Sequence, residues 1–169
     1  MQYSINKLNS LVNNKIMSEH KEKIVTILRN AISGHKKWVE NALGLIQGLP
    51  LDKSQVPVNG TECAFGEWYY SDGQSLRDLP GFKEIESLHD KLHAKYREIF
   101  VLLFGETEKI SFLGKLFGQA KKLEHAKKEE AMEKYKELKY YSEKIIKQIT
   151  KLEKFIHVMS DDQLEKYLN

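Results

Sequence analysis

Two histidines four residues apart, His89 and His93, have the spacing in this sequence that most directly indicates chemistry. On a helix they would project from the same side, as the two histidines of a helical metal-binding pair do. Two further candidates are His35, which belongs to an earlier segment, and Cys63, the single cysteine of the chain. Three imidazoles and one thiolate make a closed, four-coordinate set of zinc ligands.

The segment that carries His35 is predicted to be a helix over about 19–47. Apolar residues recur there at steps of three and four, which is typical of the seam of an antiparallel bundle or coiled coil. Leu49-Pro50 is expected to end this helix, and 48–61 to form a connection. The stripe consists of Ile24, Leu28, Ala31, His35, Trp38, Ala42 and Leu45.

His89 and His93 belong to a second predicted helix, over about 81–104, with Asp78 as its expected N-cap. Between the two helices, Cys63 falls in a short predicted helix over about 62–71 that ends near Asp72-Gly73. The stripe of the second helix consists of Phe82, Ile85, His89, Leu92, Tyr96, Ile99 and Leu103.

The remaining segments complete an all-α prediction. Residues 2–16 carry a weaker helical pattern, and 105–118 are interpreted as a connector or short helix. A long helix over 119–158 would reach roughly 60 Å if unbroken, which indicates a kink or an extension into a partner. Ser160 and Gln163 form a capping-box pattern for a short terminal helix. We expect a four-helix bundle with a short Cys-bearing helix and an extended C-terminal helix.

The two stripe histidines support metal binding more strongly together than either does alone. A single histidine in an apolar stripe is more often a hydrogen-bonded core residue than a ligand. His35 and His89, on facing seams, would meet inside the bundle, where desolvation disfavours a second positive charge, and a shared metal removes that problem. Cys63 supplies a fourth ligand only if its short helix folds over the bundle. The alternative is an inert buried cysteine that acts as a small hydrophobe, and the pattern leaves both open.

Composition argues against several other classes of protein. The chain has 41% hydrophobic and 30% charged residues and a net charge of +3, so a nucleic-acid surface is not indicated. No apolar run approaches the length of a membrane span, and the N-terminus lacks the features of a signal peptide. A lone cysteine cannot form an internal disulfide, which fits a reducing compartment. We expect a cytoplasmic protein with no nucleic-acid or membrane partner.

The motifs of common enzyme classes are not found. Glu86-x-x-His89 has the form of a di-iron ligand pair, but that site needs a second such motif, and the sequence has none. Glu86 is instead expected in solvent, or beside an imidazole that it orients. No Ser-His-Asp pattern, Walker loop or dinucleotide fingerprint is evident, and we expect no enzyme activity.

Longer motifs around the candidate ligands resemble one known family. The segments Cys63–Gly73, Leu79–Phe82 and Leu88–His93 are similar to the chemoreceptor zinc-binding (CZB) domain. The segment His35–Trp38 is similar to the first ligand motif of that family. The resemblance implies that one Zn²⁺ is bound by His35, Cys63, His89 and His93.

The resemblance covers about 20–104, and the last bundle helix is expected within 119–158. We therefore interpret 1–169 as a single CZB-like domain, either a stand-alone protein or a fragment. The family assignment implies a cytoplasmic regulator in bacterial chemotaxis or cyclic-di-GMP signalling, linked to zinc and to oxidants such as hypochlorous acid.

The chemistry of the predicted site favours one of three possible functions. Four protein ligands leave no open position for water, which favours a sensory module over a zinc hydrolase. Zinc would hold Cys63 as a thiolate, the oxidisable form, and oxidation to sulfenate would weaken the site. A purely structural zinc dimerisation unit is the alternative, because it uses the same ligands.

A homodimer is the expected assembly. Apolar seams on at least three helices exceed what one small bundle needs, and the long helix outreaches the domain. The resemblance adds that related CZB domains are dimeric. A chemoreceptor or a diguanylate cyclase is the expected signalling partner in trans.

Overall fold

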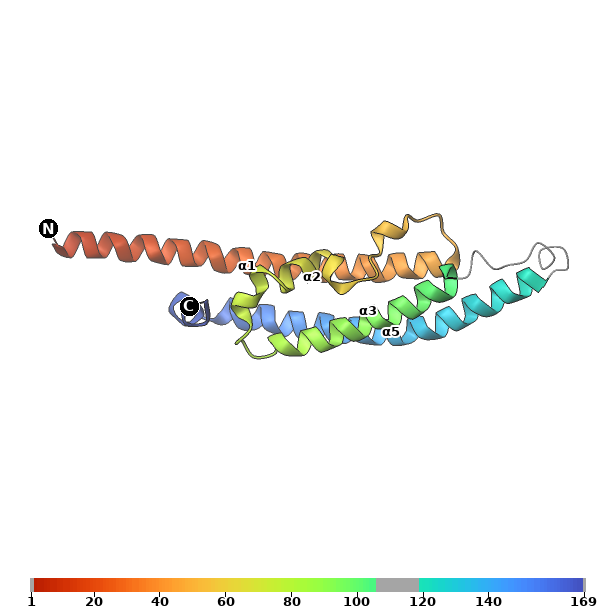
Figure 1. Ribbon diagram of the computed structural model, residues 1–169. Coiled ribbons are helices and arrows are strands. Elements are labelled where there is room, and N and C mark those ends of the chain that lie inside the picture. The colour runs from red at the N-terminus through yellow and green to blue at the C-terminus, as the bar shows by residue number, and fades with distance from the viewer. Residues whose placement is uncertain (1, 106–118, 169) are drawn as a thin grey trace.

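A computed structural model describes residues 2–105 and 119–168, and within these ranges the secondary structure is helical, with no strand (Figure 1). The α-helices are α1 (Gln2–Gln47), α2 (Ala64–Tyr69), α3 (Phe82–Phe104), α5 (Gln119–Val158) and α6 (Asp161–Leu168). Three 3-10 helices lie between α1 and α3: η1 (Lys53–Gln55), η2 (Gly60–Glu62) and η3 (Asp72–Leu76).

The bundle is formed by α1, α3 and α5, which run side by side (Figure 1). α1 and α3 run in one direction, and α5 runs back along both of them. The chain between α1 and α3 returns along α1 and carries α2, which packs against α1. The predicted all-α helical bundle is confirmed, but within the described residues it has three long helices where four were expected, and Cys63 is the N-cap of the short helix α2 and not part of it. Most of the predicted connector 105–118 lies outside the described residues.

Two segments that were predicted separately, 2–16 and 19–47, form the single helix α1. No glycine or proline precedes Gly34 in the sequence, so nothing interrupts the helix once it has formed. The N-terminal part of α1 extends beyond α5 and α6 (Figure 1). Four apolar side chains there are between 51% and 58% exposed: Ile5, Leu11, Val12 and Ile16.

Backbone hydrogen bonds end α1 at the predicted place. The Gly48 N–H donates to the Leu45 carbonyl at 3.1 Å, and the Leu49 N–H donates to the Gly44 carbonyl at 2.9 Å. This pair of bonds is a Schellman motif, and Pro50, which follows it, cannot continue the helix. The chain is thereby directed back along α1.

The predicted N-cap of α3, Asp78, is wrong. α3 begins at Phe82, and its N-cap is Gly81, which has a φ of 86°. Glycine adopts this left-handed conformation at little cost, so the turn before α3 closes at Gly81. Gln148 on α5 holds that turn by donating from Nε2 to the Gly81 carbonyl at 3.3 Å. Asp78 lies in the preceding turn and forms an exposed ion pair with Arg77.

The predicted apolar stripes form the core. All stripe positions of α1 are buried, and so are those of α3 except Leu103, which is partly buried. Each large apolar side chain buried in this way contributes about 1.5–3 kcal/mol to folding. His35 and His89 are therefore held within apolar stripes, as predicted. α5 contributes Leu138, Ile145, Ile149, Leu152 and Ile156.

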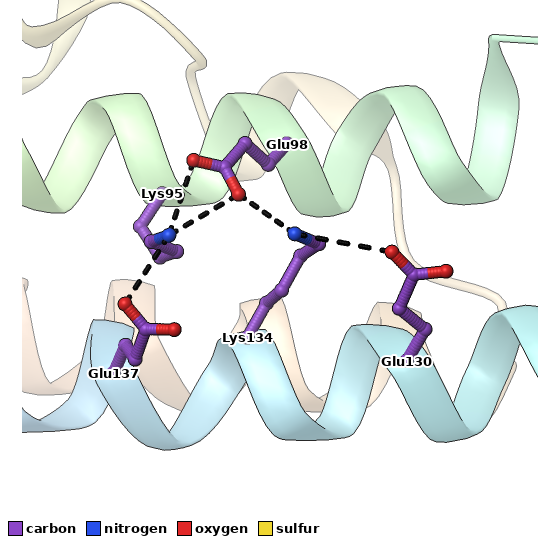
Figure 2. A network of polar contacts seen from close by, with 5 residues as sticks. All are labelled: Lys95, Glu98, Glu130, Lys134 and Glu137. Carbon is purple, nitrogen blue, oxygen red and sulfur yellow. Dashed lines mark hydrogen bonds and ion pairs between the residues drawn. The ribbon is translucent and has the colours of Figure 1, made fainter.

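Ion pairs add to the attachment of α5 to α3. Figure 2 shows Lys95 and Glu98 of α3 interleaved with three charged residues of α5, namely Glu130, Lys134 and Glu137. The contacts are Lys95–Glu98 at 3.1 Å, Lys95–Glu137 at 3.2 Å, Lys134–Glu98 at 2.8 Å and Lys134–Glu130 at 3.9 Å. The Lys134 hydrogen bond lowers the pKa of Glu98, so the carboxylate stays charged in this network.

Two other expectations from the sequence concern the start of α6 and the absence of a membrane-spanning helix. Ser160 and Gln163 form the predicted capping box at the start of α6: the Ser160 N–H donates to Gln163 Oε1, and the Gln163 N–H donates to Ser160 Oγ. Among the described residues, no helix combines the length and apolar character needed to cross a membrane.

Candidate metal centre

α3 presents two buried imidazoles on one face. His89 is 1% exposed and His93 is 4% exposed, because both lie on the side of α3 that faces the bundle. Their spacing of four residues places Nε2 of His89 and Nε2 of His93 only 3.2 Å apart. Two nitrogens converge on one point inside the fold.

The orientation of His93 is fixed by the backbone of the connection after α1. Its Nδ1 lies 3.0 Å from the Val58 carbonyl oxygen. Because a carbonyl can only accept, Nδ1 carries the proton and Nε2 keeps its lone pair. A backbone partner of this kind commonly selects the tautomer of a metal-binding histidine. The His93 imidazole is therefore arranged to bind through Nε2.

Cys63 joins the two imidazoles from the N-cap of α2. Its Sγ lies 3.3 Å from Nε2 of His89 and accepts a hydrogen bond from the Gly66 N–H at 3.2 Å. The thiol donates to the Gly60 carbonyl at 3.1 Å. The segment that carries Cys63 lies over the bundle, which was the condition for Cys63 to act as a ligand, and the packing of Phe65 edge-on against His89 helps to hold it there.

Two glycines allow this close approach. A Cβ atom on Gly66 would lie 1.7 Å from the Gly60 carbonyl oxygen, so no side chain fits at Gly66. A Cβ atom on Gly60 would lie 3.1 Å from Cε1 of His89 and 3.3 Å from Cδ2 of His93. The backbone of η2 thus packs directly onto both imidazoles, which brings Cys63 within reach of them.

The donor atoms of Cys63, His89 and His93 are close enough together to share one zinc ion. Sγ of Cys63 and ring nitrogens of His89 and His93 all lie within 4.8 Å of one another. With Zn–N of about 2.05 Å and Zn–S of about 2.3 Å, a tetrahedron places two nitrogens roughly 3.3 Å apart and a sulfur and a nitrogen roughly 3.6 Å apart. The observed N···N and S···N distances of 3.2 and 3.3 Å are close to these values. The cluster can hold a metal ion.

His35 lies beside this cluster and not within it. Its imidazole is 8% exposed and stacks on Trp38 of the same helix, with ring centroids 6.2 Å apart. Its donor atoms fall outside the group that lies within 4.8 Å of one another. Nε2 of His35 is buried and has no hydrogen-bond partner among the described residues. Its role as fourth ligand stays a prediction.

Burial sets the charge of these groups. Burial, together with the neighbouring His93 imidazole, lowers the pKa of His35 to about 4 and that of His89 to about 3. Burial also lowers the pKa of His93, and it raises the pKa of the Cys63 thiol. Near pH 7 the metal-free site therefore contains neutral imidazoles and a protonated thiol.

Other residues of the region have smaller or different roles than the sequence suggested. Glu86 is exposed, and Nδ1 of His89 has no partner in the described part of the chain, so nothing supports the predicted orienting contact between them. Trp38, which was predicted to lie in the apolar stripe of α1, contacts both His35 and His93. The position of Trp38 three residues after His35 on the same helix indicates in the sequence that the two side chains are neighbours. No feature of the sequence indicates that the Val58 carbonyl contacts His93.

Comparison with known proteins agrees with this site. Residues 35–100 match the family model of the chemoreceptor zinc-binding domain. The matched segment begins at His35, includes Cys63, His89 and His93, and lies within the predicted range 20–104. No curated protein and no solved structure matched the chain.

Proposed function

We propose that this protein is a zinc-dependent sensory module without enzymatic activity, which reports the metal occupancy or the oxidation state of Cys63. The observation that carries the proposal is the convergence of one thiol and two imidazole nitrogens within 4.8 Å, inside a CZB domain. His89, His93 and Cys63 would hold the zinc ion, with His35 as fourth ligand. Bound zinc would supply the positive charge that keeps Cys63 deprotonated at neutral pH.

The surroundings of Cys63 suit a switch that depends on the metal. Burial raises the pKa of its thiol, so metal-free Cys63 is protonated at neutral pH and less reactive than a thiolate. A thiolate would be present only in the zinc-loaded protein. Hypochlorous acid would then oxidise the sulfur to sulfenic acid, with transfer of oxygen to sulfur and release of chloride. The product is a weaker zinc ligand than the thiolate.

The segment around Cys63 offers a route from the site to the rest of the fold. The Val58 carbonyl accepts from His93, and Asn59 bridges Glu62 and Arg97 of α3, with distances of 2.7 and 3.3 Å. These contacts join residues 58–63 to α3 through polar groups, while Cys63 joins the same segment to His89. Loss of the thiolate would loosen this segment and leave the stripes of the long helices in place.

We also propose that two copies associate through the N-terminal part of α1. Its apolar side chains Ile5, Leu11, Val12 and Ile16 are exposed in the single chain. The N-terminal part of α1 extends beyond α5 and α6 (Figure 1). Substitution of Ile16 by Glu should shift a homodimer towards monomer in sedimentation velocity, and Lys15→Glu, on an 81% exposed side chain, is the control. Equal sedimentation of all three proteins would reject this interface.

The output partner is proposed from the family alone. A chemoreceptor or a diguanylate cyclase in the cytoplasm would receive the signal in trans, linking the module to chemotaxis or to cyclic-di-GMP.

The second candidate function, a structural zinc dimerisation unit, is supported by the near-complete burial of His89 and His93, which is typical of closed structural sites.

Elemental analysis combined with a zinc-release assay tests the main proposal. Wild-type protein should contain one zinc per chain and release it when Cys63 is modified. Cys63→Ser should lose affinity by at least roughly 100-fold, because even loss of a residue outside the coordination shell often costs 10- to 100-fold. Ala64→Ser, at the exposed neighbouring position, is the matched control. Full zinc content and unchanged release in Cys63→Ser would reject the proposal.

A further inference from the structure

One side of α1 stays open along much of the helix. A helix with 3.6 residues per turn keeps positions that recur at steps of three, four or seven on one side. This side is offset from the buried stripe by one residue, or about 100° around the helix. Ile27 is partly buried there, and the other residues of the set are exposed. The set, called the outer face of α1 below, consists of Ile5, Val12, Ile16, Lys23, Ile27, Asn30 and Gly34.

From Ile27 to Gly34 the outer face borders a recess. The segment after α1 lines the same recess with Cys63, Phe65 and Trp68, so much of its wall is apolar. Nothing lies within 4 Å of a Cβ on Gly34, so the space beside this residue is open in the single chain. The recess runs along α1 and suits an extended occupant with apolar side chains.

The N-terminal end of the outer face has that character. Ile5, Val12 and Ile16 are 52%, 51% and 56% exposed, on a part of α1 that extends beyond α5 and α6 (Figure 1). A single helix with apolar side chains can enter a recess, whereas the recesses of two copies cannot fill each other. The shapes therefore favour an antiparallel pairing, in which the N-terminal part of each copy faces the recess of the other.

The charges of the outer face agree with an antiparallel pairing. Glu19, at the edge of the face, precedes Lys23 by four residues, and a two-fold axis midway between them would place each beside the other type. Both are exposed, although Glu19 also lies 4.0 Å from Lys15 of its own helix. The midpoint of Ile16 and Ile27 lies within one residue of the same axis. A parallel pairing would instead bring like charges together, which is unfavourable.

We propose that two copies pair antiparallel along the outer face of α1, so that the N-terminal part of each copy lies in the recess beside Cys63 of the other. This inference rests on the proposed association through α1 and adds its orientation, its register and its consequence for the site. Ile16 lies beside the partner's Ile27, and Glu19 beside the partner's Lys23. Access of reagents to Cys63 then depends on whether the protein is a dimer.

Disulfide formation between introduced cysteines tests the orientation in the full chain. Ile16→Cys combined with Ile27→Cys should give a covalent dimer on mild oxidation, with a bond between positions 16 and 27 identified by peptide mapping. The two positions are about 16 Å apart along one helix, so they cannot bond within a chain. Wild-type protein controls for bonds made by Cys63. A bond between two copies of position 16 in Ile16→Cys would show a parallel pairing and overturn the inference.

Charge reversal tests the register. Glu19→Lys and Lys23→Glu should each weaken the dimer about tenfold in sedimentation equilibrium, because two contacts per dimer become repulsive. The double variant should recover the wild-type affinity, since it exchanges the two charges. Glu22→Lys makes the same change of charge on another side of the helix and should have little effect. Unchanged affinity in both single variants, or further weakening in the double variant, would overturn the pairing.

The reaction of metal-free Cys63 with a maleimide tests whether the partner covers the recess. At a concentration where about nine-tenths of the wild type is dimeric, Ile16→Glu should react about tenfold faster, because the wild type reacts through its monomer fraction. Lys15→Glu should react like the wild type. Equal rates in all three proteins would show that the recess stays open in the dimer and would overturn the inference.

The outcomes separate this inference from the proposals on which it rests, because the zinc content is measured on the same samples. A dimer with full zinc that forms no bond between positions 16 and 27 overturns the inference and leaves the metal site standing. A monomer with full zinc overturns the association through α1 as well. The expected bond in a protein that binds no zinc supports the inference and rejects the zinc-dependent module.

Discussion

The Sγ atom of Cys63, the N-cap of α2, lies 3.3 Å from Nε2 of His89 in α3, although the two residues are 26 positions apart in the sequence. The contact joins a thiol whose pKa is raised by burial to an imidazole whose pKa is lowered by the same cause. Neither group gains a charge from the other, because burial favours the neutral form of each. A divalent metal between them would favour the charged thiolate form of the sulfur and would leave the imidazole neutral.

Zinc binding should therefore release about one proton per site near neutral pH. The imidazoles of His35, His89 and His93 have lowered pKa values and lose no proton, whereas the Cys63 thiol must lose its own. Isothermal titration calorimetry in buffers of different ionisation enthalpy measures this number. The Cys63→Ser variant should release none. Release of two or more protons by the wild type would show that imidazoles are protonated in the metal-free protein.

Much of the scaffold was predictable because burial in a helical bundle leaves a regular trace in the sequence. The apolar stripe of α1, including His35 and Trp38, was identified from steps of three and four and is buried throughout. His89 and His93 were paired from their spacing alone, and the structure places their Nε2 atoms 3.2 Å apart. Such periodicity can be recognised without a structure because every α-helix has about 3.6 residues per turn.

The parts that were not predictable depend on how elements meet. The start of α3 at Gly81 depends on a turn that is held by Gln148 of α5. The residues near Asp78 do not contain this information, which is why the prediction of Asp78 as N-cap is wrong. The partner of His93 is the Val58 carbonyl, a group that every residue possesses. The separation of His35 from the cluster depends on the relative placement of α1 and α3, which an apolar stripe does not determine.

Substitution of Gly66 by Ala should damage the metal site more than the helix in which it lies. Its Cβ would meet the Gly60 carbonyl oxygen at 1.7 Å, so η2 must move away from His89 and His93. We expect a loss of about 1–3 kcal/mol in the free energy of unfolding, as for other overpacked sites, together with weaker zinc binding.

Gly34→Ala is the matched control for that substitution. Nothing lies within 4 Å of a Cβ at Gly34, and the residue is in the middle of α1. This variant should be more stable by about 0.5–1 kcal/mol, since alanine is the better helix former. Chemical denaturation and zinc titration of both variants measure the two effects. Normal zinc affinity in Gly66→Ala would contradict the role given to the close approach of η2.

The metal-free protein should lose stability as the pH falls below about 6.5. Burial keeps His35 and His89 neutral in the folded state, with pKa values of about 4 and about 3, whereas the unfolded chain protonates near 6.5. Protonation therefore favours unfolding. The contribution of each residue is complete above pH 6.5 and declines as the pH falls towards the folded pKa, with a limiting slope of about 1.4 kcal/mol per pH unit.

Urea denaturation of the metal-free protein between pH 4 and pH 7 measures that slope. His35→Gln should reduce the slope of the unfolding free energy against pH by the contribution of one histidine. His157→Gln, at an exposed position, should leave the slope unchanged. A profile for His35→Gln that runs parallel to the wild type would show that His35 is protonated in the folded state.

Oxidation of zinc-loaded protein by substoichiometric hypochlorous acid distinguishes the sensory function from the structural one. A sensor should be modified at Cys63 before Met17, Met132 or Met159, because zinc holds the sulfur as a thiolate. Zinc should then be released, and residues 62–73 should lose protection from hydrogen exchange while α3 keeps most of its own, since its stripe stays buried. Reductant should restore the starting state if oxidation stops at sulfenate.

The metal-free protein is the control, and its protonated Cys63 should react more slowly. Methionine oxidation with Cys63 unmodified, or global unfolding once zinc leaves, would establish the site as structural.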